Sequence, residues 1–143
     1  MIDVFHHIPD VEQFLREAVR VLKSGGKIVM VEPANTLWGR FIYQNFHHEP
    51  FLPDVLDWQL PPGGPLSMAN GALPWIVLER DWEQHTSKIF PELNLIKMEV
   101  KFPLIYLLSG GLTLPQLLPR WLAVFLDNLF PNGMFYEIVI EKK

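Results

Sequence analysis

The sequence feature that most constrains the fold is an amphipathic segment followed at once by two glycines and a short apolar run. Apolar residues recur at spacings of three and four over residues 10–23, which predicts a helix with one apolar face. Asp10 is the expected N-cap, and Gly25-Gly26 is the expected left-handed stop. The apolar, β-branched run from Lys27 to Val31 predicts a strand buried on both faces, as in parallel sheets. Helix, turn and strand together predict half of a βαβ unit.

Periodicity in the rest of the chain predicts both helices and strands, so the expected fold class is α/β. The expected strands lie near residues 1–8, 27–32, 94–102 and 134–141. The expected further helices lie at residues 36–46, 81–89 and 114–130, whereas the pattern over 70–78 is ambiguous. The helix at 36–46 is expected to place four apolar residues on one side, namely Leu37, Phe41, Ile42 and Phe46.

Prolines and glycines interrupt the middle of the chain. Five prolines and Gly63-Gly64 fall between residues 50 and 65, and they exclude regular structure there apart from one turn. We therefore expect residues 50–70 to form a loop or lid, and residues 102–131 to form a hydrophobic helical insertion. Both belong to one expected domain, residues 1–143, because single domains usually span ~100–200 residues.

Composition excludes several classes of protein. The net charge of −4 has the wrong sign for a nucleic-acid-binding protein, and no basic cluster offsets it. The absence of cysteine excludes disulfide frameworks and cysteine-ligated metal sites. The N-terminal residues lack the basic start and apolar run of a secretory signal, so a cytoplasmic location is expected. The uncharged stretch at 102–119 is interrupted by prolines and glycines, which is unlike a spanning helix but leaves a membrane-surface contact open.

Three short stretches follow one another in a characteristic order near the start of the chain. They are Asp3-Val4-Phe5-His6-His7-Ile8-Pro9-Asp10, then Arg20-Val21-Leu22-Lys23-x-Gly25-Gly26, then Met30-Val31-Glu32-Pro33. This pattern resembles the second half of a class I S-adenosylmethionine-dependent methyltransferase domain. In that family such stretches end the fourth strand, close the following helix and form the fifth strand.

The resemblance implies a fold, an activity and a cofactor. The fold is a partial Rossmann-like sheet of strands equivalent to the fourth to seventh, with the seventh antiparallel between the fifth and sixth. The activity is methyl transfer, and the cofactor is S-adenosylmethionine. The acceptor is expected to be small or hydrophobic.

The sequence also departs from this family. It contains no glycine-rich turn between a strand and a helix, which would approach the cofactor, and no acidic residue ending a second strand. Gly25-Gly26 follows a helix and precedes a strand, which is the reverse context. We therefore expect a truncated domain with little or no activity alone, in which Met1 is an internal residue. An exposed strand edge then predicts a homo-oligomer or pairing with a separate cofactor-binding half.

Four residues are the candidates for the site. The resemblance places Asp3 and Phe5 beside the cofactor, and it places His7 and Glu32 at the acceptor as catalytic residues. A histidine is suited to take a proton from an oxygen or nitrogen acceptor near neutral pH. Capping of strand and turn is the alternative role for these residues. His6 and His7 are expected to point to opposite faces of a strand, so that only one of them enters a site.

No metal site is expected from the spacing of the histidines. His47, His48 and Glu49 could be combined with His85, but the sequence lacks the i, i+4 histidine pair or cysteine partners that make such sites specific.

The sequence is also compatible with two other functions. One is a non-catalytic interaction or dimerisation module that docks onto a second chain. The other is a peripheral membrane methyltransferase half acting on a hydrophobic acceptor, which depends on residues 102–130 alone.

Overall fold

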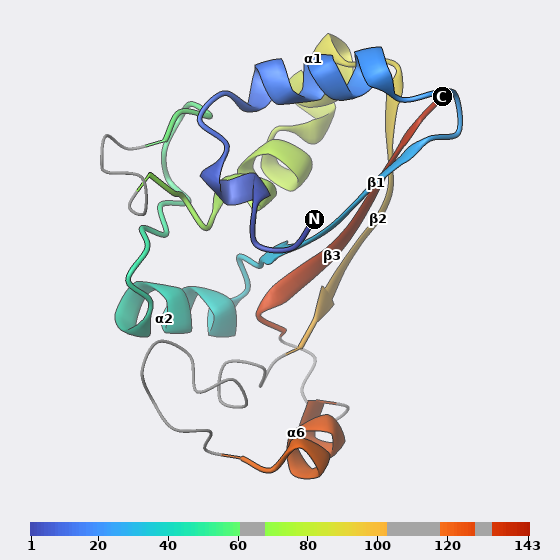
Figure 1. Ribbon diagram of the computed structural model, residues 1–143. Helices are drawn as coiled ribbons and strands as arrows, with labels where there is room; N and C mark the ends of the chain where they lie inside the picture. Colours follow the sequence, from blue (N-terminus) through green and yellow to red (C-terminus); the bar gives the residue numbers. More distant parts are fainter. Residues whose placement is uncertain (61–67, 103–117, 128–132) are drawn as a thin grey trace.

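The structure is a computed structural model that describes residues 1–60, 68–102, 118–127 and 133–143, and it has a mixed α/β architecture (Figure 1). Three strands form one sheet in the order β1-β3-β2, and their bounds are Lys27–Pro33 for β1, Leu93–Lys101 for β2 and Phe135–Lys142 for β3. β3 pairs antiparallel with both neighbours, so β1 and β2 run in the same direction. The expected order, with an antiparallel last strand in the centre, is confirmed. The equivalence of these strands to those of methyltransferases stays a prediction.

Residues 1–3 extend the sheet beyond β1 in a parallel direction. The Met1 amino group donates to the Val29 carbonyl at 2.7 Å, and the Val31 amide donates to the Met1 carbonyl at 3.1 Å. The Asp3 amide continues the ladder by donating to the Val31 carbonyl at 2.9 Å. Ile2 and Val31 form the one parallel bridge of the described residues. An isolated parallel bridge therefore precedes the first helix, in the direction that a βαβ unit requires.

The prediction of a strand over residues 1–8 is wrong for the residues that follow this short segment. Asp3 has a left-handed backbone, with φ of 51°, which turns the chain away from β1, and aspartate tolerates that conformation better than most residues. Phe5–His7 then form the 3₁₀ turn η1. The physical reason is a carboxylate at the end of β1, which attracts the amides of this segment and is described below.

Helix α1, Val11–Val21, has the predicted N-cap and position, but its C-cap is the extended Leu22 and the predicted glycine stop lies three residues later, in the turn before β1. The Asp10 carboxylate accepts a hydrogen bond from the Gln13 amide at 2.8 Å, and Gly25 has a left-handed φ of 77° before β1 begins. Figure 1 shows α1 lying across one face of the sheet. Val11 and Leu15 are buried there against β1 and β3. The predicted half of a βαβ unit is confirmed.

A second helical stretch covers the same face of the sheet. It consists of four short consecutive elements, α3 (Leu73–Trp75), the π-helices η2 (Ile76–Arg80) and η3 (Trp82–Thr86), and α4 (Ser87–Ile89). The sequence predicted a helix only from residue 81, so the ambiguous residues before it are helical as well. The Thr86 hydroxyl donates to the Val77 carbonyl at 2.6 Å and ties the two π-helices together. Leu73, Val77 and Leu78 join the main core.

The other face of the sheet is not covered by any described residue. Val29 in β1 is 51% exposed and Ile96 in β2 is 50% exposed. The prediction that the strand at 27–32 is buried on both faces is therefore wrong. Side chains along β3 alternate between the covered and the uncovered face of the sheet. Tyr136, Ile138 and Ile140 are buried, while the intervening residues are partly exposed. A one-sided sheet is typical of antiparallel pairing.

Helix α2, Leu37–Phe46, forms where the sequence predicted it, but it buries a different face. The Thr36 hydroxyl accepts from the Gly39 amide at 2.9 Å and caps the helix. Leu37, Phe41 and Phe46 are largely exposed, whereas Ile42 and Tyr43 are buried. The Tyr43 hydroxyl donates to the Met134 carbonyl at 2.8 Å. The contact with the start of β3 therefore determines which face of α2 is buried. The spacing of apolar residues within the helix did not predict that face.

The loop and the insertion predicted from the sequence are described only in part. Residues 50–60 and 68–70 contain no helix or strand, and the rest of the predicted lid lies outside the described residues. Helix α6, Arg120–Asp127, falls within the predicted insertion of 102–131, of which residues 103–117 and 128–131 lie outside the description. The domain boundaries stay a prediction.

None of the described helices is long and apolar enough to cross a bilayer.

Substitution Gly39→Ala tests the close packing at the start of α2. Alanine normally stabilises a helix relative to glycine, but here a Cβ would lie 2.3 Å from the Ala34 carbonyl oxygen. We expect unfolding to become easier by about 1–3 kcal/mol, as for overpacked positions. Urea unfolding followed by circular dichroism measures it. Asn45→Ala on the exposed side of the same helix is the control and should stabilise by a few tenths of a kcal/mol at most. A stabilised Gly39→Ala variant would contradict the geometry.

Candidate functional site

Glu32 near the end of β1 is the centre of a buried polar cluster. Its side chain is fully buried, and one carboxylate oxygen accepts from the Val4 amide at 2.9 Å and from the Phe5 amide at 2.8 Å. The other oxygen lies 2.7 Å from Nδ1 of His6. These contacts hold η1 against the end of β1. A buried carboxylate needs such donors, because leaving its oxygens unpaired costs several kcal/mol.

His6 is buried between two carboxylates. Its side chain is 2% exposed, Nδ1 faces Glu32, and Nε2 lies 3.3 Å from Oε2 of Glu49. Burial alone lowers the pKa of His6, but the hydrogen bond and charge of Glu32, reinforced by the charge of Glu49, outweigh it, so the pKa is raised above its ordinary value.

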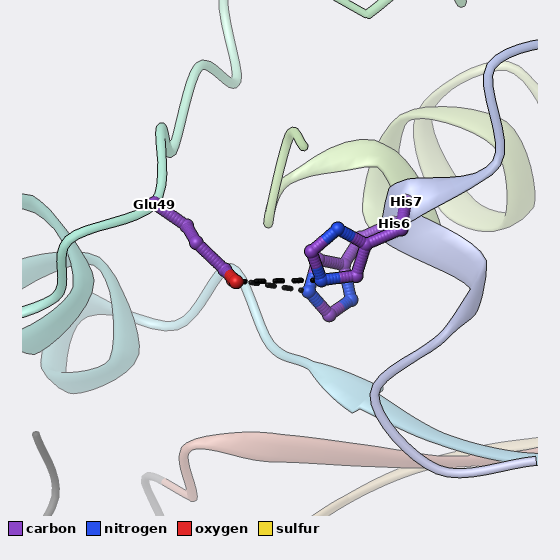
Figure 2. A group of neighbouring side chains, drawn as sticks. All are labelled: His6, His7 and Glu49. Atoms are coloured by element: carbon purple, nitrogen blue, oxygen red, sulfur yellow. Dashed lines mark hydrogen bonds and ion pairs between the residues drawn. The ribbon is translucent and has the colours of Figure 1, made fainter. Parts of the chain in front are cut away.

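His7 lies beside His6 and faces the same carboxylate (Figure 2). Its Nε2 is 3.4 Å from Oε1 of Glu49, and its Nδ1 is 3.4 Å from the Met68 carbonyl oxygen. The two imidazole rings have centroids 4.2 Å apart. The prediction that these neighbours point to opposite faces is therefore wrong. It assumed a strand, where successive side chains alternate, whereas a 3₁₀ turn lets both rings turn toward one side.

Glu49 reaches the cluster from the loop that follows α2. The exposed ring of His48 is 3.6 Å from Glu49, and the ring of His47 is 3.8 Å from it. Nδ1 of His47 accepts from the Glu49 amide at 3.1 Å, and burial lowers the pKa of His47, with the Glu49 charge opposing and the nearby histidines assisting. Four of the five histidines of the chain thus surround one carboxylate.

Asn70 fixes the loop on which Glu49 stands. Its side chain is almost fully buried; it donates to the Leu52 carbonyl at 3.0 Å and accepts from the Leu52 amide at 2.9 Å. The backbone amide of Asn70 donates to the His6 carbonyl at 3.0 Å. One residue therefore ties the loop to η1, so Glu49 and the histidine pair are held by a common support.

The cluster opens into a cavity of about 350 Å³. It lies where residues 1–3 and β1, two parallel neighbours, reach their carboxyl ends, and this is where ligands bind in open α/β sheets. The polar wall consists of Asp3, His6, His7, His47 and Glu49. The remaining lining residues are Pro33, Tyr43, Pro50, Phe51, Gly71 and Phe135. A larger hollow of about 840 Å³ lies between the start of α1 and residues 56–60. It also has titratable side chains in its lining, but Asp10 caps α1 and Asp81 is paired with Arg80 and Trp58.

The four residues predicted from the sequence have different surroundings. Asp3 and His7 line the cavity. Desolvation raises the pKa of Asp3, the charge of His6 opposes, and the charge of Glu32 assists. Glu32 touches the cavity only through His6, because its oxygens are engaged by η1. The Phe5 ring is fully buried and packs edge to face on Phe14, with centroids 5.9 Å apart, so this ring anchors the turn and is not available to a ligand.

Two central members of the cluster, His6 and Glu49, are not apparent as a pair from the sequence. His6 was assigned to the face opposite His7, and Glu49 was considered only with its neighbouring histidines and His85. The spacing between His6 and Glu49 is 43 residues, and no local pattern links them. His85 instead packs against Trp58, with ring centroids 5.0 Å apart.

Comparison with known proteins gives one match. The family model described as "Methyltransferase domain" matches residues 1–30. This stretch includes the parallel segment, η1, α1 and the first part of β1, and it carries the three cavity residues Asp3, His6 and His7. The match supports a methyltransferase domain. No curated protein and no solved structure matches the chain.

Substitution Glu32→Gln tests whether the buried carboxylate holds the cluster. The amide group has the same shape, but its NH₂ would face a donor, either a backbone N–H or the His6 ring. We expect a loss of at least about 2 kcal/mol in the free energy of unfolding, measured by urea denaturation. Glu83→Gln on the exposed side of η3 is the matched control and should change it by less than about 0.5 kcal/mol. Equal stability of the two variants would contradict the role assigned to Glu32.

Proposed function

We propose that the chain is the acceptor-side part of an S-adenosylmethionine-dependent methyltransferase domain, with the cavity beside η1 as the place of methyl transfer. One observation carries the proposal. The segment that matches a methyltransferase domain, residues 1–30, is the segment that supplies Asp3, His6 and His7 to the cavity.

The arrangement of the sheet supports this proposal. Residues 1–3, β1, β3 and β2 follow one another across the sheet, with β3 antiparallel to β1 and β2. We propose that they are equivalent to the fourth, fifth, seventh and sixth strands of a class I methyltransferase. The cavity then lies beyond the carboxyl ends of two parallel strands, which is the usual position of a cofactor in such sheets.

The chemistry that the protein must add to methyl transfer is limited. The sulfonium of the cofactor already makes the methyl group electrophilic, so the protein aligns the two reactants and accepts a proton from a hydroxyl or amine acceptor. We propose that Asp3, at the mouth of the cavity, borders the cofactor and that His7 accepts the proton. Glu32 acts as a positioning residue through η1 and His6. Tyr43, Phe51 and Phe135 give the acceptor an aromatic wall.

Tight cofactor binding would need a glycine-rich turn between a strand and a helix, and the residues that the structure describes contain none. We therefore expect this chain to bind the cofactor weakly and to have little or no activity alone. A second segment, in the same protein or in a partner, would supply the missing contacts.

A titration with S-adenosylhomocysteine, followed by amide chemical shifts of the ¹⁵N-labelled chain, tests the proposal. We expect millimolar binding with shifts confined to residues 3–8 and 33–36, at the carboxyl ends of the two parallel strands. Asp3→Asn should weaken the binding several-fold, whereas Glu83→Gln should not change it. No shift at millimolar ligand, or shifts that cluster on the far end of α1 or on β2, would refute the proposal.

A second candidate function is a dimerisation module, which the uncovered face of the sheet favours. Val29 and Val139 are directly paired across β1 and β3, and Lys27, Glu137 and Glu141 surround them on the same face. Charged residues of both signs around an apolar centre can pair with those of a second copy of the chain related by two-fold symmetry. We propose a homodimer through this face.

Light scattering of the purified chain tests the dimer. We expect a mass twice that of the single chain at high concentration, because burying Val29 against a second copy removes apolar surface from water. Val29→Lys places a charge in the contact and should give a monomer, while Glu83→Lys on the helical side should leave the dimer intact. A monomeric wild-type chain at high concentration would exclude the dimer without affecting the methyltransferase proposal.

A further inference from the structure

We propose that His6, His7 and Glu49 form a binding site for a divalent transition-metal cation, with Zn²⁺ as the best match. This site goes beyond the proposed methyl transfer and does not depend on it. The observations that carry it are the spacing of the three ligand atoms, the partners of the other ring nitrogens, the burial of the support and the cavity beside it.

The ligand atoms lie close enough together to share one cation. Zn²⁺ binds imidazole nitrogen and carboxylate oxygen at about 2.0–2.2 Å, so two ligands at tetrahedral angles lie about 3.3–3.5 Å apart. Oε2 of Glu49 lies 3.3 Å from Nε2 of His6, and Oε1 lies 3.4 Å from Nε2 of His7, so each ring faces a different oxygen of the carboxylate. The ligand atoms of all three residues lie within 4.8 Å of one another. Figure 2 shows both rings directed at the Glu49 carboxylate.

Both rings have their second nitrogen at an acceptor. Nδ1 of His6 lies 2.7 Å from the Glu32 carboxylate, and Nδ1 of His7 lies 3.4 Å from the Met68 carbonyl oxygen. When Nδ1 donates to its oxygen acceptor, the lone pair of Nε2 is directed at Glu49 and can bind a cation. Metal-binding histidines have this second contact to a carboxylate or carbonyl, because it fixes the tautomer and the orientation of the ring.

The two Nε2 lone pairs and the Glu49 carboxylate would repel one another if nothing lay between them. Either protons or a cation must occupy this position. A cation contacts all three atoms at once, whereas a proton bridges only one Nε2 to Glu49; if both Nδ1 atoms are donating, protons on both Nε2 atoms make both rings positively charged, with centroids 4.2 Å apart. Two like charges at that separation are unfavourable in a site that is largely withdrawn from water.

The support of the three ligands is rigid. His6 is held by Glu32 at the end of β1, and Glu49 stands on the loop that Asn70 ties to η1. Fixed second contacts of this kind reduce the reorganisation that binding requires. The other possible set, Asp3, His6 and Glu32, is a poorer candidate, because Glu32 already accepts two backbone amides and the His6 ring.

Three protein ligands leave a fourth position open, and here it faces the cavity of about 350 Å³. Zinc sites that act on substrates have this composition, with water or a substrate atom in the open position. The site would therefore take a small ligand with a hydroxyl, carboxylate or similar oxygen donor. Two imidazoles favour Zn²⁺ over Mg²⁺, which prefers oxygen ligands and keeps its water. With a cation bound, His7 is a ligand and not a base, so metal titration also separates these two roles.

Calorimetric titration of the metal-free full chain with Zn²⁺ alone tests the site, in competition with a chelator of known affinity. We expect one equivalent to bind, with micromolar or tighter affinity and release of protons, and Mg²⁺ to give no binding. His7→Ala and Glu49→Gln should each weaken the binding by at least about tenfold. Both residues are partly accessible, and unchanged circular dichroism will show that these variants remain folded.

Two matched controls keep the test specific. His85→Ala removes a histidine beside Trp58, and His48→Ala removes an exposed one that lies 3.6 Å from Glu49. Both should leave Zn²⁺ binding unchanged. Visible absorption of a Co²⁺-substituted sample should show the intense bands of a four-coordinate site, and Glu49→Gln should abolish them. Absence of Zn²⁺ binding, or binding lost in His48→Ala but kept in His7→Ala, would overturn the proposal, and neither result bears on the shifts expected with S-adenosylhomocysteine.

Discussion

The interaction on which the site depends is the hydrogen bonding of the buried Glu32 carboxylate. A carboxylate without exposure to water is strongly destabilising unless donors replace its hydration. Here the donors are the amides of Val4 and Phe5 and the ring of His6. The need to satisfy this one charge explains why the chain leaves the sheet after three residues, although its apolar start would continue a strand. Breaking that arrangement would leave an uncompensated charge in the interior.

The consequences of this turn extend to every feature of the site. It brings two adjacent imidazoles to the same side, and it directs them at a carboxylate from a loop 43 residues further along the chain. It also buries Phe5 in the core, which holds the turn between α1 and the helices at 73–89. The polar cluster and the apolar core therefore stabilise each other. The segment that matches a methyltransferase domain is structurally important for the same reason, since it supplies both the turn and two of its histidines.

Local patterns predicted most of the fold. The helix after Asp10, the glycine turn and the strands near 27–32, 94–102 and 134–141 are confirmed, because capping, left-handed glycine and alternation act within a few residues. The predictions that were wrong have one cause in common. The buried face of α2, the exposure of Val29 and the turn at residues 5–7 depend on which distant segment lies opposite. In α2 the decisive contact is from Tyr43 to Met134, which are separated by 91 residues.

The sequence by itself determined the types of element, their order and the stretch that resembles a methyltransferase. The resemblance also pointed to Asp3 and His7, which line the cavity; their roles stay a prediction. Only the tertiary structure decided that Phe5 is core, that Glu32 supports the turn, and that His6, His7 and Glu49 converge. The reason is physical: hydrogen bonding and helical periodicity act between near neighbours, whereas a site assembled from η1, β1 and a loop depends on burial of a charge and on contacts that form only when the chain is folded.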